Sequence, residues 1–311
     1  MRRVRYEHGG GPEVLFAEEA PVPEPGPGEL LLKTEAIGVT LPVVRKVRES
    51  AEPIALGGEV AGEVVRVGEG VREYAPGDRV TGLCFGHGYA DYALLHTAMT
   101  SRVPAGATAR DAVALVRSGV VALGALEAAG PGEGASEGGS VLVTAAASGV
   151  GHLALQLARL RGASRVVAAV GDPAKADFVR SLGADEVVAY GDAHWGDPVD
   201  IALDAVGGDL LTPALRALAP GGRLVAYSSG GGTIAAYDLL VGGKSAIGFQ
   251  VARVAREEPL RYAGWIAELW RLFAEGALRP AVHAEFALED AGRAHAVIEG
   301  RGNRGKVILV P

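Results

Sequence analysis

The sequence predicts an α/β protein in which a β-rich region precedes a unit of alternating strands and helices. Residues 1–112 consist mainly of short β-prone runs, and the prolines at 21–27 keep that segment extended. Residues 141–172 read instead as strand, turn, helix and strand, and this alternation continues to about residue 251. Short glycine-rich strands favour a barrel, whereas alternating strands and helices favour a parallel sheet.

The composition limits the class of protein. The chain has 311 residues, 49% hydrophobic and 22% charged, with a net charge of −7. This length fits two domains, and the acidic balance argues against nucleic-acid or membrane-surface binding through bulk charge. No apolar run could span a bilayer and none follows the basic start, so we expect a cytoplasmic protein without a signal peptide. The single cysteine, Cys84, excludes an intramolecular disulfide and a multi-cysteine zinc site.

Residues 141–172 have the size and pattern of a dinucleotide-binding βαβ unit. In such a unit, free N–H groups and the helix dipole bind a pyrophosphate where small side chains let the backbone approach. Against the G-x-G-x-x-G fingerprint the turn reads Ala146, Ser148 and Gly151, so two of three glycines are replaced. The turn alone also fits an ordinary α/β protein, but its place between a strand and a helix favours nucleotide binding.

The remaining elements follow from periodicity and from proline and glycine. Strands are expected over 4–6, 14–17, 30–36 and 79–83, with bulged strands where Val60, Val64, Val65 and Val67 alternate among glycines. A flexible surface loop is expected over 131–139. Helices are then expected over 173–182, 210–219 and 258–275, and strands over 186–190, 199–205, 223–228 and 245–251. The Pro-Gly-Gly run at 220–222 should end the second of these helices, and the aromatic residues of the third should pack in a core or between domains.

Six segments, in chain order, resemble the medium-chain dehydrogenase/reductase superfamily and its zinc-independent quinone oxidoreductase (ζ-crystallin-like) branch. They are PVPEPGPGELLLKTEAIGV, GGEVAGEVVRVGEGVREYAPGDRV, AAASGVGHLALQLAR, DAVGG, APGGRLVAYSS and the terminal GKVIL. The resemblance implies a GroES-like β-barrel catalytic domain over residues 1–113, completed by 280–311. It also implies a doubly wound, parallel-sheet Rossmann domain over 114–279. Helices over 109–129, opened by Thr108 or Asp111, would connect the two domains.

The resemblance also implies chemistry without a metal. Zinc-using relatives carry a histidine where this chain has Gly58, and the seven histidines are not spaced as a cluster. Without a Lewis acid, hydride transfer needs an acceptor that is already electron-poor, such as a quinone or another α,β-unsaturated carbonyl.

The resemblance favours NADPH over NADH as the cofactor. The end of the second strand, where NAD enzymes carry an acidic residue, reads Val170 and Gly171, and Lys175 and Tyr190 match positions that hold the 2′-phosphate in NADPH-dependent relatives. Asp172 would repel phosphate if it pointed inward, but we interpret it as the cap of the helix that starts at Pro173. Lys175 has the alternative interpretation of a solvated charge.

Further cofactor contacts are implied by position in the family pattern. Ala147, Ser148, Gly149 and Val150 would lie along the pyrophosphate, and Val206 and Gly207 would lie near the adenosine side. Tyr227, Ser228 and Ser229 would line the nicotinamide side, and Phe249, Asn303 and Lys306 would close over the cofactor.

The segment 40–50 departs from the family pattern. Relatives continue there with Asn, Asp and a Tyr that some enoyl reductases use as a proton donor, whereas this chain has none of these residues. Thr40, Arg45 and Lys46 are candidates by location only, and the two basic residues also fit a solvated helix face. The sequence therefore names no catalytic proton donor.

The leading hypothesis is thus an NADPH-dependent, metal-free enzyme that reduces a small quinone or enone. The alternatives are an enoyl reductase of secondary metabolism acting on an acyl thioester, and a nucleotide-bound sensor with little turnover. An apolar edge strand over 247–251 and the family resemblance make a homodimer the expected assembly.

Overall fold

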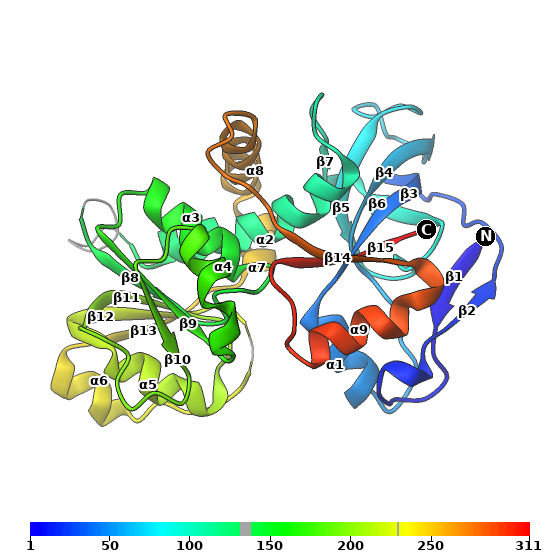
Figure 1. Ribbon diagram of the computed structural model, residues 1–311. Helices are drawn as coiled ribbons and strands as arrows, with labels where there is room; N and C mark the ends of the chain where they lie inside the picture. Colours follow the sequence, from blue (N-terminus) through cyan, green and yellow to red (C-terminus); the bar gives the residue numbers. More distant parts are fainter. Residues whose placement is uncertain (131–137, 229) are drawn as a thin grey trace. The chain divides into compact units, whose positions relative to one another are not determined.

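The computed structural model describes residues 1–130, 138–228 and 230–311, and the chain divides into two compact units (Figure 1). Unit 1 comprises Met1–Arg117 and Pro280–Pro311, and unit 2 comprises Ser118–Arg279. Helix α2 (Ala109–Ala128) belongs to both, because the division falls within it. At its start the Thr108 hydroxyl accepts from the Asp111 N–H (3.1 Å) and the Asp111 carboxylate accepts from the Thr108 N–H (2.8 Å). The two residues expected as alternative helix starts therefore act together.

Unit 1 is built on a seven-stranded sheet in the order β14-β15-β3-β4-β5-β7, with β6 also pairing with β3. The register of β3 against β4 shifts between Leu31 and Leu32 and again between Thr34 and Ala36, which confirms the bulges expected from the sequence. Helices α1 (Leu41–Glu49) and α9 (Ala291–Glu299) complete the unit, and β1 (Arg2–Arg5) and β2 (Phe16–Glu19) form a separate pair. The strands of the main sheet are β3 (Glu29–Val39), β4 (Gly58–Val67), β5 (Arg79–Cys84), β6 (Tyr92–His96), β7 (Thr100–Arg102), β14 (Val282–Ala287) and β15 (Lys306–Val310).

Unit 2 is a six-stranded, wholly parallel sheet in the order β10-β9-β8-β11-β12-β13. Helices α3 (Gly151–Leu160) and α4 (Ala176–Ser181) cover one face, and α5 (Leu211–Arg216) and α6 (Ala236–Gly242) cover the other (Figure 1). Helices α7 (Val251–Glu257) and α8 (Pro259–Ala274) follow the last strand. The strands are β8 (Ser140–Val143), β9 (Arg165–Val170), β10 (Glu186–Ala189), β11 (Val199–Asp204), β12 (Leu218–Ala226) and β13 (Ser245–Gly248). The expected fold class, a β-barrel-type domain plus a doubly wound parallel-sheet domain, is confirmed.

Two expected boundaries are wrong. The helix expected over 210–219 ends at Arg216, and the Pro-Gly-Gly run at 220–222 lies inside β12 rather than ending the helix. A break in pairing makes this possible, because Val199 pairs with Leu218 whereas Ile201 pairs with Arg223. The strand expected over 245–251 ends at Gly248, and Val251 begins α7. The loop expected over 131–139 falls mainly outside the described residues.

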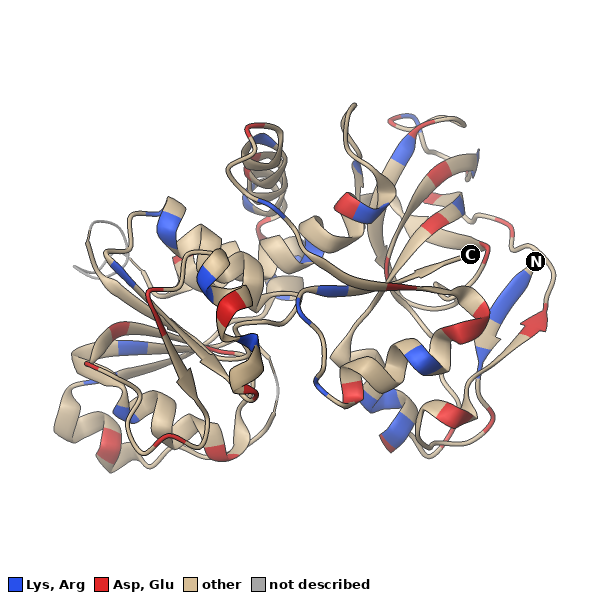
Figure 2. Ribbon diagram, viewed as in Figure 1, with Lys and Arg blue, Asp and Glu red and all other residues tan. Residues whose placement is uncertain are grey.

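Apolar packing holds each unit together. In α8, Tyr262 and Trp265 are buried and Trp270 meets the edge of Phe273 at 5.9 Å, so the aromatic residues pack as expected. Basic and acidic residues are interspersed along both units (Figure 2). No helix in the described ranges is both long and apolar enough to span a membrane.

Candidate functional site

The turn between β8 and α3 is wound so tightly that its small residues are required. Ala145 adopts a left-handed conformation (φ 47°), and its N–H donates to the Tyr190 hydroxyl at 2.8 Å. A Cβ at Gly151 would lie 2.2 Å from the Ala145 carbonyl oxygen, so only glycine fits that position. The Ser148 hydroxyl accepts from the Gly151 N–H at 3.0 Å and fixes the first turn of α3. This helix start offers backbone N–H groups with little side-chain cover.

The four turn residues expected along a pyrophosphate differ in exposure. Ala147 is 3% exposed, so only its backbone could face a ligand, whereas Ser148, Gly149 and Val150 are half-buried. Their contact with a nucleotide stays a prediction.

Two of the residues expected to distinguish NADPH from NADH, Gly171 and Tyr190, lie beside this turn. A Cβ at Gly171 would approach the Tyr190 ring at 3.3 Å, so the small residue leaves room where β9 ends. Asp172 accepts from the Ala174 N–H at 2.9 Å, which confirms that it caps the short 3-10 turn at 173–175. Lys175 is only 8% exposed, and the alternative interpretation of a solvated charge is therefore wrong.

Two glycine-rich loops, residues 206–208 and 230–232, contact each other at the carboxyl ends of β11 and β12. The Gly208 N–H donates to the Gly231 carbonyl at 2.8 Å, and a Cβ at Gly230 would lie 1.6 Å from the Val206 carbonyl oxygen. Gly207 has a positive φ of 69° and donates its N–H to the buried Asp204 carboxylate at 2.8 Å. Such loops let a ligand approach bare backbone.

The Asp204 carboxylate holds the loop at 206–208 in place. Besides the Gly207 N–H, its carboxylate accepts from the Thr144 hydroxyl at 2.9 Å, so it links the end of β11 to the turn after β8. Its structural role was not foreseen from the sequence, although the DAVGG motif that contains it was noted there.

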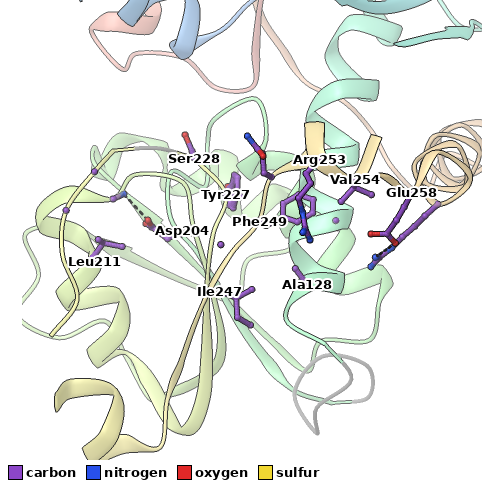
Figure 3. A pocket seen from close by; sticks show the side chains of 18 residues that line it. Ala128, Asp204, Leu211, Tyr227, Ser228, Ile247, Phe249, Arg253, Val254 and Glu258 are labelled. Carbon is purple, nitrogen blue, oxygen red and sulfur yellow. Dashed lines mark hydrogen bonds and ion pairs between the residues drawn. The ribbon is translucent and has the colours of Figure 1, made fainter. Parts of the chain in front are cut away.

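A cavity of about 870 Å³ in unit 2 lies over the carboxyl ends of β11, β12 and β13 (Figure 3). In a doubly wound sheet, ligands bind at this end of the strands. Gly207, Tyr227, Ser228 and Phe249, all expected to contact the cofactor, line the cavity, whereas Val206 does not. Ser229 lies outside the described residues.

Tyr227 has a buried hydroxyl without a hydrogen-bond partner in the described parts of the chain. Burial is the main cause that raises the pKa of this phenol, and the negative charge of Asp204 adds to it. The phenol is therefore neutral at physiological pH.

In unit 1, one edge of the sheet brings together distant parts of the sequence. Pairing of Gly38 with Glu59, of Val39 with Val307 and of Gly58 with Cys84 places the ends of β3 and β5 beside the starts of β4 and β15. Thr40, which follows β3, is 9% exposed and makes no capping bond with its side chain. On α1, Arg45 is half-buried and Lys46 is exposed.

The same edge contains a buried ion pair between Glu59 and Lys306, which are 2% and 3% exposed. Arg117 lies 3.8 Å from the same Glu59 oxygen, and the other oxygen, Oε2, has no partner in the described ranges. A Cβ at Gly38 would lie 2.4 Å from Glu59 Cγ, so glycine makes room for the pair. Burial lowers the pKa of Lys306, and the neighbouring Glu59 carboxylate opposes this effect.

The two C-terminal residues expected to close over a cofactor are held within unit 1. The Lys306 ammonium bonds to Glu59, and Asn303 donates its side-chain amide to the Gly305 carbonyl at 2.8 Å. Their contact with a cofactor stays a prediction.

Within residues 1–130, 138–228 and 230–311, no three His, Cys, Asp or Glu side chains are placed to hold a metal ion. The Cys84 thiol is 3% exposed and donates to the Gly86 carbonyl at 2.8 Å. Burial raises the pKa of this thiol, which makes it a poor nucleophile.

Comparison with known proteins agrees with this description. The alcohol dehydrogenase GroES-like domain family matches residues 26–115, and the family described as zinc-binding dehydrogenase matches residues 182–309. Rat quinone oxidoreductase is 32% identical over all of this chain and 98% of its own length. A spectinabilin polyketide synthase protein of Streptomyces orinoci is 34% identical over 98% of this chain, which corresponds to 14% of that much longer protein.

Two solved structures with NADPH bound are similar over their full length. The mycobacterial protein Rv1454c complexed with NADPH is 30% identical with a TM-score of 0.91, and each chain is covered completely. Escherichia coli quinone oxidoreductase complexed with NADPH is 27% identical with a TM-score of 0.89, again with complete coverage.

The fold and the site define an oxidoreductase of the medium-chain dehydrogenase/reductase superfamily. Within that superfamily, the chain belongs to the quinone oxidoreductase branch.

Proposed function

We propose that this protein is an NADPH-dependent, metal-independent oxidoreductase that reduces quinones or other α,β-unsaturated carbonyls. The observation that carries the proposal is the cavity of unit 2, where glycine loops leave backbone uncovered at the carboxyl ends of parallel strands. The turn before α3 fits the pyrophosphate of a dinucleotide in the same way. The residues present therefore fit the cofactor.

The preference for NADPH rests on the end of β9. Gly171 offers no carboxylate to a ribose hydroxyl, and the Asp172 carboxylate is engaged in capping the following turn. Lys175 and Tyr190 would hold the 2′-phosphate, because a cation and a hydroxyl both favour it. The NADPH complexes of the two similar structures support the same choice.

Bound NADPH supplies a hydride to an electron-poor carbon of the acceptor. The chain's own contribution is to orient the nicotinamide between Tyr227, Ser228 and Phe249 and to exclude water from the reacting atoms. Metal independence is supported by the donor set, since Gly58 replaces the histidine of zinc-using relatives and the buried Cys84 thiol already bonds to a backbone carbonyl.

Two measurements test this function. NADPH oxidation should proceed with a quinone panel or an enone panel and should be unaffected by a chelator. A thermal-shift experiment should show greater stabilisation by NADPH than by NADH at equal concentration. If neither nucleotide stabilises the protein, or if activity is lost on chelation and restored by added metal, the proposal is wrong.

An enoyl reductase acting on an acyl thioester is the second candidate. The similarity to part of a polyketide synthase protein favours it, because thioesters are the substrates of such systems. Turnover with acyl thioesters but not with quinones or enones would identify the protein as an enoyl reductase. Tight NADPH binding without turnover of any of these substrates would identify it as a sensor.

A homodimer through β13 is the proposed assembly. This strand lies at the edge of the sheet of unit 2, where its unpaired backbone groups invite a second strand. The neighbouring helix α6 exposes Tyr237 (72%), Leu240 (76%) and Val241 (68%), and Asp238 is the one charged residue in its sequence. A monomer mass by light scattering would contradict this assembly.

A further inference from the structure

The lining of the cavity in unit 2 differs from one end to the other. The glycine loops with Asp204 and Leu211 form one end, and Tyr227 and Phe249 lie between this end and residues from α2, α7 and α8 (Figure 3). The second end combines small or apolar residues with charged ones: Gly124, Ala128, Val254, Arg253, Glu258 and Arg261. If the glycine end receives the phosphate and ribose groups, the helical end is left for the acceptor.

Most charged groups of this lining already have strong partners. Arg261 bonds to Glu258 at 3.0 Å and to Glu127 at 3.1 Å, and its guanidinium lies 5.2 Å from the centre of the Trp265 ring. These bonds, first to Glu258 and then to Glu127, raise the pKa of Arg261. The Asp204 carboxylate is likewise held by backbone N–H groups and a hydroxyl.

Arg253 is the exception. Its guanidinium makes no hydrogen bond with the described residues, and its single ion pair, to Glu257 one helical turn later, is long at 3.7 Å. Glu257 is closer to Arg256, at 2.8 Å. Figure 3 shows Arg253 along the same wall as Phe249, which the cofactor's nicotinamide would approach. Arg253 is therefore a cation whose N–H donors are available to a ligand at the acceptor end of the cavity.

The proposed reaction needs such a group. When an acceptor receives the hydride at carbon, its π electron pair would move onto its carbonyl oxygen, and water would supply the one proton that completes the reduction, leaving the cofactor oxidised. The negative charge on that oxygen is stabilised by a cationic donor that is already in place, and because the Arg253 side chain is 63% exposed, solvent screens part of this effect. The segment 40–50 lacks the Asn, Asp and Tyr of relatives, so it does not supply these groups.

We propose that Arg253 binds the carbonyl oxygen of the quinone or enone and stabilises the oxyanion formed on reduction. This inference rests on the proposed function and deepens it, because it selects acceptors that carry a carbonyl oxygen in conjugation with the reduced carbon. Arg253 acts here as an electrostatic catalyst rather than a proton donor, since its guanidinium stays charged.

The test compares Arg253→Met and Arg253→Lys with the control Arg256→Met. Arg256 is on the same helix and is exposed, but it does not line the cavity. We expect Arg253→Met to lower kcat with a quinone by about 10-fold, because solvent screens this exposed side chain, and Arg253→Lys to restore part of it. The Kd for NADPH and the Tm should stay close to those of the wild type in all three variants.

A binding measurement gives a readout that is independent of turnover. The anion of 2-hydroxy-1,4-naphthoquinone resembles the reduced acceptor in its negative oxygen, and neutral 1,4-naphthoquinone is its matched control. With NADP⁺ present, Arg253→Met should weaken binding of the anion by at least about tenfold and of the neutral quinone by less than threefold.

The outcomes separate the two proposals. The role of Arg253 alone is overturned if the wild type is active and the Arg253→Met variant keeps kcat within threefold. The same conclusion follows if this variant loses affinity equally for the anion and for the neutral quinone. A wild type that oxidises NADPH with no quinone or enone overturns the proposed function and this inference with it.

Discussion

The candidate sites of the two units are formed by different kinds of chemical groups. In unit 2 the site is mainly backbone, with glycine loops at 206–208 and 230–232 and a helix start whose neighbours are small. In unit 1 the corresponding sheet edge is held by buried ionisable side chains, above all Glu59 and Lys306. The backbone site requires side chains small enough for the tight turn, as at Ala146, Ser148 and Gly151, whereas a buried charge depends on its few partners. Changes in unit 1 should therefore act on stability, and changes in unit 2 on nucleotide affinity.

The largest expected effect is on the buried pair of unit 1. Lys306→Met leaves the buried Glu59 carboxylate with only the long ion pair to Arg117 at 3.8 Å, which should lower the free energy of unfolding by up to about 3–5 kcal/mol. The double variant Glu59→Gln/Lys306→Met should recover much of this loss in denaturant titrations. If changes in unit 1 act on stability and not on nucleotide affinity, the Kd for NADPH of the folded Lys306→Met variant should differ from that of the wild type by less than about threefold. A large loss of affinity at full stability would instead support contact between Lys306 and the cofactor.

The second effect is the pH dependence of unit 1. His295 is 1% exposed and shares a hydrogen bond of 3.2 Å with Tyr89, and burial lowers its pKa from 6.5 to about 4, against a raising effect of Glu299. The folded protein thus resists protonation that the unfolded chain accepts. The corresponding stability is complete above pH 6.5 and is lost as the pH falls to 4, by about 3 kcal/mol.

The control for this effect is His295→Leu, which has similar volume and no titratable group. The difference in unfolding free energy between wild type and variant should depend on pH between 6.5 and 4. Parallel curves over that range would show that His295 is not the source.

The third effect concerns the turn of unit 2. Gly151→Ala places a methyl group 2.2 Å from the Ala145 carbonyl, so the turn must move and its N–H groups lose their alignment. We expect the Kd for NADPH to rise by about 100-fold, measured by calorimetry, which corresponds to roughly 2.7 kcal/mol. Gly191→Ala is the matched control, because nothing lies within 4 Å of a Cβ there. If the two variants bind NADPH with the same Kd, the turn is not part of the nucleotide site.

The smallest effect should sharpen the choice of cofactor. Lys175→Met removes the charge proposed to meet the 2′-phosphate, so the Kd for NADPH should rise by about 10-fold or more while that for NADH stays unchanged. Arg180→Met, an exposed position on α4, serves as the control. Equal loss of both nucleotides would mean that Lys175 supports the fold and does not recognise phosphate.

Some differences between expectation and structure have a common physical cause. The Pro-Gly-Gly run at 220–222 reads locally as a helix stop, but a break in register between β11 and β12 accommodates it within a strand. The local sequence around Lys175 also fits the alternative of a surface charge on a short helix, yet tertiary packing buries this side chain. Register and burial depend on residues distant in the chain, which local periodicity does not contain.

The sequence by itself determined the fold class, the family, the nucleotide-type turn and the capping role of Asp172, because these depend on local pattern and on short motifs. Only the tertiary structure decided that Asp204 braces the glycine loops, that Lys306 is bound to Glu59 and that Arg253 lines the cavity with Phe249. These relations join side chains up to 247 positions apart. No local pattern encodes such distances, because the sheets that bring the residues together form only when the whole chain packs.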